Sequence, residues 1–210
     1  MTNNLKKLIS FTSLMTLSLH LHAINYYISP TGNDNNAGTR EEAPLASLAT
    51  VQKKVKAGDK VYILPGTYQV KENEMMDRTS SNVWDIIFDF ATSGTADSPI
   101  IYKGVQDAQG NRPVFDLSAI NTGKRLTGFY IRAKYLEFSN FEVIGINVPK
   151  SSSNTQSENI RINGGSYCRF YNIAAHDGMG IGFYLTGRSA HNIISHCDAY
   201  NNFDSVNISV

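Results

Sequence analysis

Residues 160–210 carry one four-residue pattern three times: Ile160-Arg-Ile-Asn163, Phe183-Tyr-Leu-Thr186 and Val206-Asn-Ile-Ser209. Apolar and polar residues alternate in each run, as they do in a strand with one buried face. The first run begins 23 positions before the second, and the second begins 23 positions before the third. An earlier run, Phe129-Tyr-Ile-Arg132, fits the same pattern 31 positions before the first. Strands that recur at a nearly fixed interval predict a solenoid.

Two further columns repeat in step with these strands. A second strand pattern occurs at Asn140-Phe-Glu-Val143, Asn172-Ile-Ala-Ala175 and His196-Cys-Asp-Ala199, and turn residues follow at Gly145, Asp177-Gly178 and Asn201-Asn202. A β-sandwich with chance alternation is the alternative, but agreement of three columns favours the solenoid. The longer interval contains a polar stretch, Lys150–Glu158, which indicates a tolerated surface insertion or one wall of a binding groove.

Composition and the first residues bound the class of protein. The chain has 210 residues, 41% hydrophobic and 18% charged, with a net charge of +1 and no basic cluster after residue 7, so nothing favours nucleic acid as a partner. Lys6-Lys7, the apolar stretch Leu8–Leu21 and the small residue at Ala23 are typical of a signal peptide over residues 1–23. An uncleaved anchor is the alternative. We therefore expect a β-helix domain over residues 24–210 that is secreted, periplasmic or on the cell surface, with no membrane span in the mature form.

A short amphipathic segment precedes the strands. Leu48, Val51 and Val55 recur at helical spacing, and Gly58 is placed to end a helix. Because a solenoid exposes core at each end, a helix over residues 45–56 is expected to cap the N-terminal end. The loop around Asp34 resembles a calcium-binding loop. It lacks an acidic ligand at the last position of such a loop, which favours a plain solvated loop.

The two cysteines are not expected to form a disulfide. The repeat places Cys197 in the column of Ile173, five residues beyond the column of Cys168. Five extended residues separate two columns by roughly 15 Å, beyond the reach of a disulfide. Cys197 is therefore expected to pack against the core.

Outward-facing side chains form two rows in the predicted stack. One row contains Tyr130, Arg161, Tyr184 and Asn207, and the next contains Arg132, Asn163, Thr186 and Ser209. Aromatic and hydrogen-bonding groups along an extended face suit a hydroxyl-rich polymer such as a glycan. Arg161 and Tyr184 are the candidate binding residues of this face, although exposed strand faces are polar by default.

His176-Asp177-Gly178 is the segment that most resembles an active site. His176 is placed to act as a base oriented by the Asp177 carboxylate. The turn register explains Asp177-Gly178 without catalysis, so both interpretations stand. Histidine and aspartate spacing elsewhere, at His191, His196, Asp198 and Asp204, predicts no metal site.

The chain resembles a known family. The opening segments Tyr26–Asp34 and Gly58–Tyr68 are similar to the start of many secreted right-handed β-helix proteins. His176–Gly187, Asn192 and Cys197–Val206 resemble pectate lyases of polysaccharide lyase family 9. The resemblance implies an all-β, right-handed parallel β-helix whose full-length members cleave polygalacturonate by calcium-dependent β-elimination. In that reaction calcium held by aspartates neutralises the uronate carboxylate and a lysine removes the C5 proton.

The family's catalytic motifs are not found in this chain. The resemblance implies calcium aspartates in Asp-Gly and Asp-Asp-Gly-x-Asp motifs after the Asp204-Ser-Val206 segment, and a lysine further on, whereas this sequence stops at Val210. We therefore assign no catalytic residue and no metal ligand. His176, Asp177, Tyr184 and Arg161 remain as candidate substrate-binding residues.

These observations predict a pectate-lyase-like β-helix that is truncated before its catalytic coils. Its expected partner is an acidic plant polysaccharide, polygalacturonate or pectin, and Ca²⁺ is expected for the full-length family without a complete site here. The alternative is a non-catalytic glycan-binding or surface β-helix protein. An uncapped C-terminal end would expose core and a strand edge, which predicts self-association.

Overall fold

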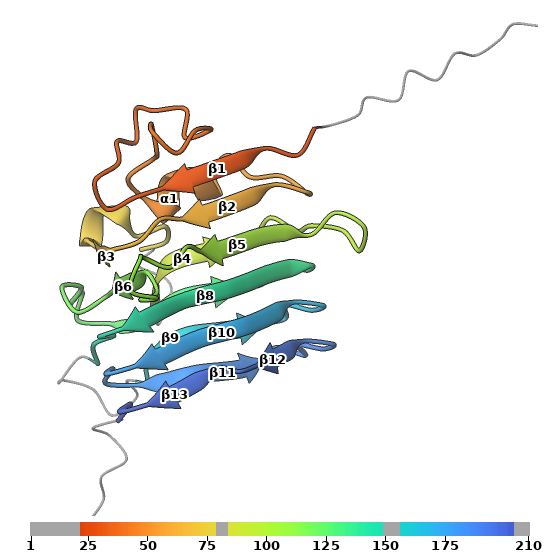
Figure 1. Cartoon of the computed structure of the whole chain (residues 1–210). Helices are drawn as coiled ribbons and strands as arrows, with labels where there is room; N and C mark the ends of the chain where they lie inside the picture. The colour runs from red at the N-terminus through yellow and green to blue at the C-terminus, as the bar shows by residue number, and fades with distance from the viewer. Residues whose placement is uncertain (1–21, 79–83, 149–155, 204–210) are drawn as a thin grey trace, which may run out of the picture.

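The computed structural model describes residues 22–78, 84–148 and 156–203, which wind through two parallel β-sheets around a shared core (Figure 1). The larger sheet has nine strands: β1 (Asn25–Ile28), β2 (Lys60–Ile63), β3 (Thr67–Gln69), β5 (Ile100–Gly104), β6 (Val114–Asp116), β8 (Leu136–Ile144), β10 (Arg169–His176), β12 (Ile193–Ser195) and β13 (Asp198–Tyr200). The smaller sheet has four: β4 (Trp84–Phe90), β7 (Arg125–Ile131), β9 (Glu158–Asn163) and β11 (Ile181–Thr186). The strands of the larger sheet stack in chain order, which confirms the solenoid (Figure 1).

The repeat seen in the sequence is the register of the smaller sheet. Phe129 of β7 pairs with Ile160 of β9, and Ile160 pairs with Phe183 of β11. All recorded pairings between these strands are parallel, so residues of one column share a face. The predicted third run, Val206–Ser209, lies outside the described residues.

The predicted second column forms a bend within the larger sheet. Asn140, Asn172 and His196 have φ values of 60°, 52° and 54°, in the left-handed region that most residues avoid. Each bend divides a coil into an early and a late strand segment, as β12 and β13 are divided by His196. Gly104 meets the Asn140 bend, where a Cβ atom would collide with the Asn140 carbonyl.

Aromatic rings fill the core in stacks that cross from coil to coil. Phe138 stacks on Tyr102 at 5.1 Å and on Phe170 at 5.0 Å between ring centroids. Such ring pairs add to the free energy gained by burying their area. The core thus follows the same one-coil repeat as the strands.

The N-terminal segment departs from prediction. Helix α1 spans only Leu48–Gln52, so the expected helix over residues 45–56 is too long. Its last turn tightens, with Lys53 N–H bonding the Thr50 carbonyl and Lys54 N–H bonding the Val51 carbonyl, and Val55 N–H also bonds the Val51 carbonyl. The helix packs against β1 and β4, the first strands of the two sheets. Its capping role stays a prediction.

The Asp34 loop is more than a solvated loop. Asp34 Oδ1 accepts hydrogen bonds from the backbone N–H groups of Ala46 and Ser47, and Oδ2 accepts one from the Ser47 hydroxyl at 2.8 Å. Burial acts to raise the pKa of Asp34, but the bonds from Ser47 outweigh it and the pKa is lowered. The loop is therefore fastened to the start of α1.

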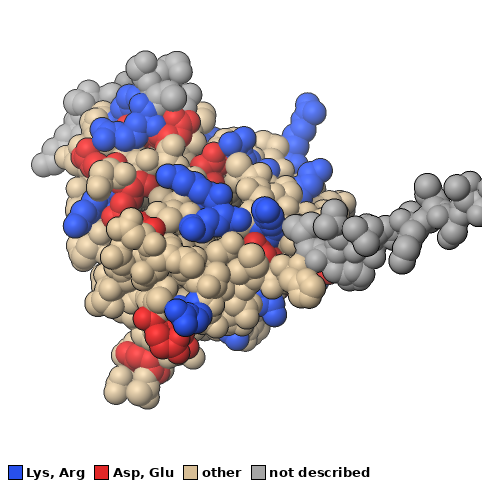
Figure 2. Space-filling model, turned by 90° about the horizontal axis from the view of Figure 1, so that it is seen from above, with Lys and Arg blue, Asp and Glu red and all other residues tan. Residues whose placement is uncertain are grey.

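Both cysteines are free, as predicted. Cys168 is buried and Cys197 packs against the core while remaining partly exposed. In the part of the chain that the structure describes, no helix is long and apolar enough to cross a membrane. Over the end of the molecule nearest β1, acidic and basic side chains are interspersed (Figure 2).

Candidate functional site

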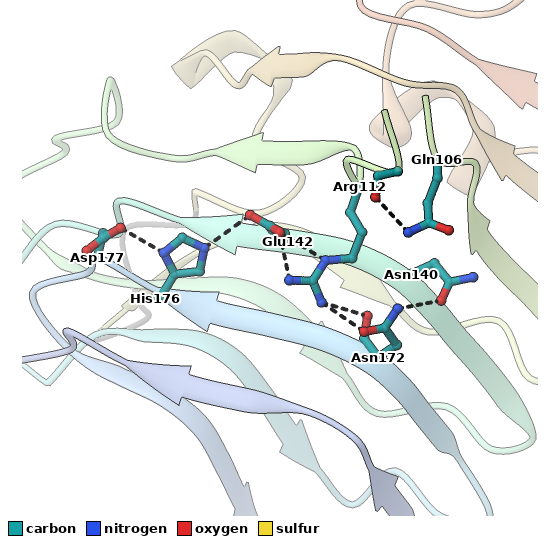
Figure 3. Close-up of polar contacts among 8 residues, drawn as sticks. Gln106, Arg112, Asn140, Glu142, Asn172, His176 and Asp177 are labelled. Carbon is teal, nitrogen blue, oxygen red and sulfur yellow. Dashed lines mark hydrogen bonds and ion pairs between the residues drawn. The ribbon is translucent and has the colours of Figure 1, made fainter. Parts of the chain in front are cut away.

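His176 lies at the end of β10, on the outer face of the larger sheet, between two carboxylates (Figure 3). Its Nδ1 is 2.7 Å from Asp177 Oδ2, and its Nε2 is 3.2 Å from Glu142 Oε2. The two carboxylates therefore hold the imidazole ring in place, one at each nitrogen.

Arg112 extends this cluster to the asparagine bend. It pairs with Glu142 at 2.7 Å and donates to the Asn172 carbonyl oxygen at 3.2 Å and Oδ1 at 3.1 Å. Asn172 in turn donates to Asn140 Oδ1 at 2.9 Å (Figure 3). Basic side chains and carboxylates alternate along this row. We call its four residues, Arg112, Glu142, His176 and Asp177, the His176 corner.

Contacts at the His176 corner lower the pKa of Asp177 and raise the pKa of Tyr200. Hydrogen bonds from His176 and Asn201 lower the pKa of Asp177. The Tyr200 ring stacks on His176 with centroids 4.4 Å apart, and burial followed by the Glu142 charge raises the pKa of Tyr200. The corner thus presents a fixed pattern of charges and hydrogen-bonding groups.

Arg161 and Tyr184 meet on the outer face of the smaller sheet. The Arg161 guanidinium carbon lies 5.3 Å from the centroid of the Tyr184 ring and 4.7 Å from that of Trp84. The four predicted residues therefore form two pairs, one on each sheet. Trp84 was not predicted, because the period of its strand is ambiguous in the sequence.

Glu158 holds the Arg161 cluster together. Its Oε1 lies 3.0 Å from Arg125 Nη2 and 3.3 Å from Arg161 Nη1, and the Thr127 hydroxyl donates to Oε2 at 3.0 Å. Burial raises the pKa of Glu158, and Arg161, Thr127 and Arg125 oppose that shift. Arg161 was predicted from the outward row, whereas Glu158 and Arg125 were not; the Arg125–Glu158 contact joins strands that are 33 residues apart.

The outward rows predicted from the repeat are confirmed within the described strands. Tyr130 pairs with Arg161 and Arg161 with Tyr184, and Thr186 pairs with Asn163. Asn207 and Ser209 lie outside the described residues. Arg132 of the second row binds Asp89 through two hydrogen bonds, at 2.9 and 2.8 Å.

A calcium ion needs several oxygen ligands at one place. Within residues 22–78, 84–148 and 156–203, no group of three His, Cys, Asp or Glu side chains is placed to hold a metal ion. The carboxylates of the His176 corner are instead occupied by Arg112 and His176. These residues do not fit a calcium ion. His191 stacks on Tyr167, and the His196 ring lies tilted against Tyr171 with the ring centroids 5.1 Å apart.

The coils, the asparagine bend and the outward charged rows define a right-handed parallel β-helix of the kind that includes polysaccharide lyases. Residues 26–208 match the family model described as "Pel9A-like, right handed beta helix region", and the chain belongs to this family.

Three relatives show how far the likeness extends. A solved rhamnogalacturonan lyase is 41% identical, with a TM-score of 0.76 over 88% of this chain and 43% of that chain. The solved pectate lyase Pel9A is 25% identical, with a TM-score of 0.65 over 86% of this chain and 40% of that one. Pectate lyase L of Dickeya dadantii is 28% identical over 181 residues, 85% of this chain and 37% of its own length. The chain thus spans less than half the length of these relatives.

Proposed function

We propose that this chain is part of the β-helix of a secreted polysaccharide lyase and binds a galacturonate-containing polysaccharide. The observation that carries the proposal is the 41% identity to a rhamnogalacturonan lyase over 88% of the chain. Pectate lyases match over a similar share at lower identity. The names of all these relatives refer to galacturonate polymers, and the higher identity favours rhamnogalacturonan as the tighter ligand.

The outer surface offers suitable chemistry for such a ligand. Guanidinium groups recognise carboxylates through paired hydrogen bonds, and aromatic rings offer apolar surface with specific geometry. Arg161 lies against two aromatic rings on the smaller sheet, and Arg112 brings positive charge to the larger one. A uronate polymer combines carboxylates with apolar ring faces, so it matches both kinds of group.

Cleavage is a separate matter from binding. β-Elimination needs a base for the C5 proton and neutralisation of the neighbouring carboxylate. In the described residues both nitrogens of His176 face carboxylates, which leaves it poorly placed as a base. We therefore propose that the chain on its own binds its polysaccharide and releases little unsaturated product. The proposal has three further parts. Cleavage by the full-length family protein depends on calcium, residues 1–23 direct secretion, and the coils that carry out catalysis lie beyond Val210.

The test is a binding titration of the purified chain with polygalacturonate, rhamnogalacturonan and a neutral glucan. We expect both acidic polymers to bind, rhamnogalacturonan more tightly, and the neutral glucan not to bind. A parallel incubation with calcium should give little ultraviolet absorbance from unsaturated product. Equal binding of the neutral glucan would contradict the proposed ligand, and strong calcium-dependent absorbance would contradict binding without cleavage.

A further inference from the structure

A second polar surface lies on the larger sheet, beside the early segments of β8, β10 and β12. Two adjoining hollows of about 220 and 320 Å³ share the residues Glu137, Arg169 and Ile193. The first is completed by Ala96, Pro99, Tyr135, Tyr167 and His191, and the second by Ile101, Phe138, Ser139, Phe170, Tyr171 and Ser195. We call the two hollows together the Arg169 groove.

Strand register places these side chains on one face. Glu137, Arg169 and Ile193 are direct partners across β8, β10 and β12. Two residues on, Ser139, Tyr171 and Ser195 form the next row of the same face. The groove therefore runs across successive coils, along the axis of the stack, as an extended polymer would.

Stacked rings form one wall of the Arg169 groove. Tyr167 stacks on Tyr135 at 5.0 Å and on His191 at 4.6 Å between centroids. All three have φ between 56° and 58°, a left-handed conformation that is strained at a residue other than glycine. Tyr167 remains 44% exposed, so this column of stacked rings has a surface that a ligand can contact.

Arg169 supplies an accessible cation in the middle of the Arg169 groove. Its Nε lies 3.9 Å from Glu137 Oε1, longer than a hydrogen bond, and 67% of its side chain is exposed. Exposed ion pairs of this kind contribute little to stability, so the Arg169 guanidinium can exchange Glu137 for a ligand carboxylate. Lys103, exposed and paired in register with Ser139, adds a second positive charge to the same face.

We propose that the Arg169 groove binds an acidic oligosaccharide segment, with the Arg169 guanidinium on a uronate carboxylate and the Tyr167 ring against the sugar. This inference rests on the proposed function for the identity of the polymer. The Arg169 groove is distinct from the His176 corner, because Arg169 and His176 lie at opposite ends of β10 with the Asn172 bend between them.

The experiment compares Arg169→Gln with Arg78→Gln by calorimetric titration with an oligogalacturonide and with a rhamnogalacturonan oligosaccharide. Arg78 is a matched control because it is also an exposed arginine in an ion pair, with 46% of its side chain exposed, but follows Asp77, which is bridged to β4 of the smaller sheet. We expect Arg169→Gln to weaken binding about tenfold, the loss of one charge-assisted contact, and Arg78→Gln to change it less than about twofold.

Tyr167→Asn provides a second variant, since asparagine tolerates the left-handed backbone. It should also weaken binding several-fold while the circular dichroism spectrum stays that of the unmodified chain. If the unmodified chain binds but Arg169→Gln and Arg78→Gln behave alike, the proposed role of the Arg169 groove is wrong and the proposed function stands. If the unmodified chain binds neither acidic oligosaccharide, both proposals fail.

Discussion

Glu158 is a fully buried carboxylate between two arginines, on a sheet face that would otherwise be solvated. Arg125 also donates to the Gln156 carbonyl at 2.6 Å, and the Ser157 hydroxyl accepts from Leu126 N–H. The segment before β9 is thereby fixed to β7. The charged groups at Glu158 therefore attach the segment before β9 to the rest of the stack.

We predict that Glu158→Gln destabilises the protein by about 3 kcal/mol, because it leaves two partly buried guanidinium groups without their carboxylate. Urea denaturation followed by circular dichroism measures the change. The control is Glu72→Gln, since Glu72 forms an exposed ion pair with Arg78 and its loss should cost under about 1 kcal/mol. Equal effects of the two variants would show that burial of Glu158 does not matter.

Single residues were the least predictable level from sequence. The outward rows identified Arg161 and Tyr184, because alternation alone decides which strand residues face out. Trp84 joins that cluster by lying against Arg161, and Glu158 joins it by pairing with Arg125; both contacts link strands far apart in the chain, which alternation does not report. Asp34 was likewise predicted to be solvated. Its carboxylate accepts hydrogen bonds from backbone N–H groups 12 and 13 residues away, and the local sequence does not reveal such contacts.

At the scale of elements, the left-handed corners recur with the coils. Tyr135, Asn140 and Gly145 mark three corners of one coil, and the equivalent residues of the next two coils also have positive φ: Tyr167, Asn172 and Asp177, then His191, His196 and Asn201. A coil therefore changes direction at fixed positions. Asparagine suits the middle corner because its amide also bonds its neighbour in the stack.

We predict that Asn172→Ala costs about 2 kcal/mol of stability and Asn172→Gly about 1 kcal/mol. Both variants lose the bonds to Asn140 and Arg112, but only alanine carries the strain of a left-handed backbone. The difference between their free energies of unfolding isolates that strain. Identical values would mean that the corner is held by the side-chain bonds alone.

Elements were predicted well wherever they repeat. The columns through Phe129, Ile160 and Phe183 were placed in register because stacked coils must bury the same face. The helix did not repeat, and its length was overestimated because hydrophobic spacing continues to Val55, beyond the regular helix over Leu48–Gln52. The ring column of the Arg169 groove was missed, because no pattern marks aromatic residues at left-handed corners.

On the scale of the whole molecule, the described coils end with apolar side chains in the open. Leu185 and Ile194 occupy columns that are buried in earlier coils by Ile162 and Phe170, yet both are exposed, as is Phe203. Exposed apolar patches at a sheet edge favour association. Self-association through this end is a proposal that follows from the sequence prediction.

We expect the chain, expressed as residues 24–210, to associate as its concentration rises. Sedimentation velocity over a dilution series measures this. Ile194→Lys should shift the distribution toward monomer, whereas Lys60→Glu, a charge change at the opposite end of the stack on β2, should not. A monomer at all concentrations, or equal effects of the two variants, would contradict association through this end.

Strand order in the larger sheet follows chain order, and this has a consequence for how the molecule comes apart. Each coil is joined by hydrogen bonds to the coil before it and the coil after it, so cooperativity passes only between neighbours. Unfolding should then begin at the less stable end of the stack and spread from one coil to the next. Amide hydrogen exchange would show this as a gradient of protection along the axis, with the Phe138 and Phe170 coils exchanging last.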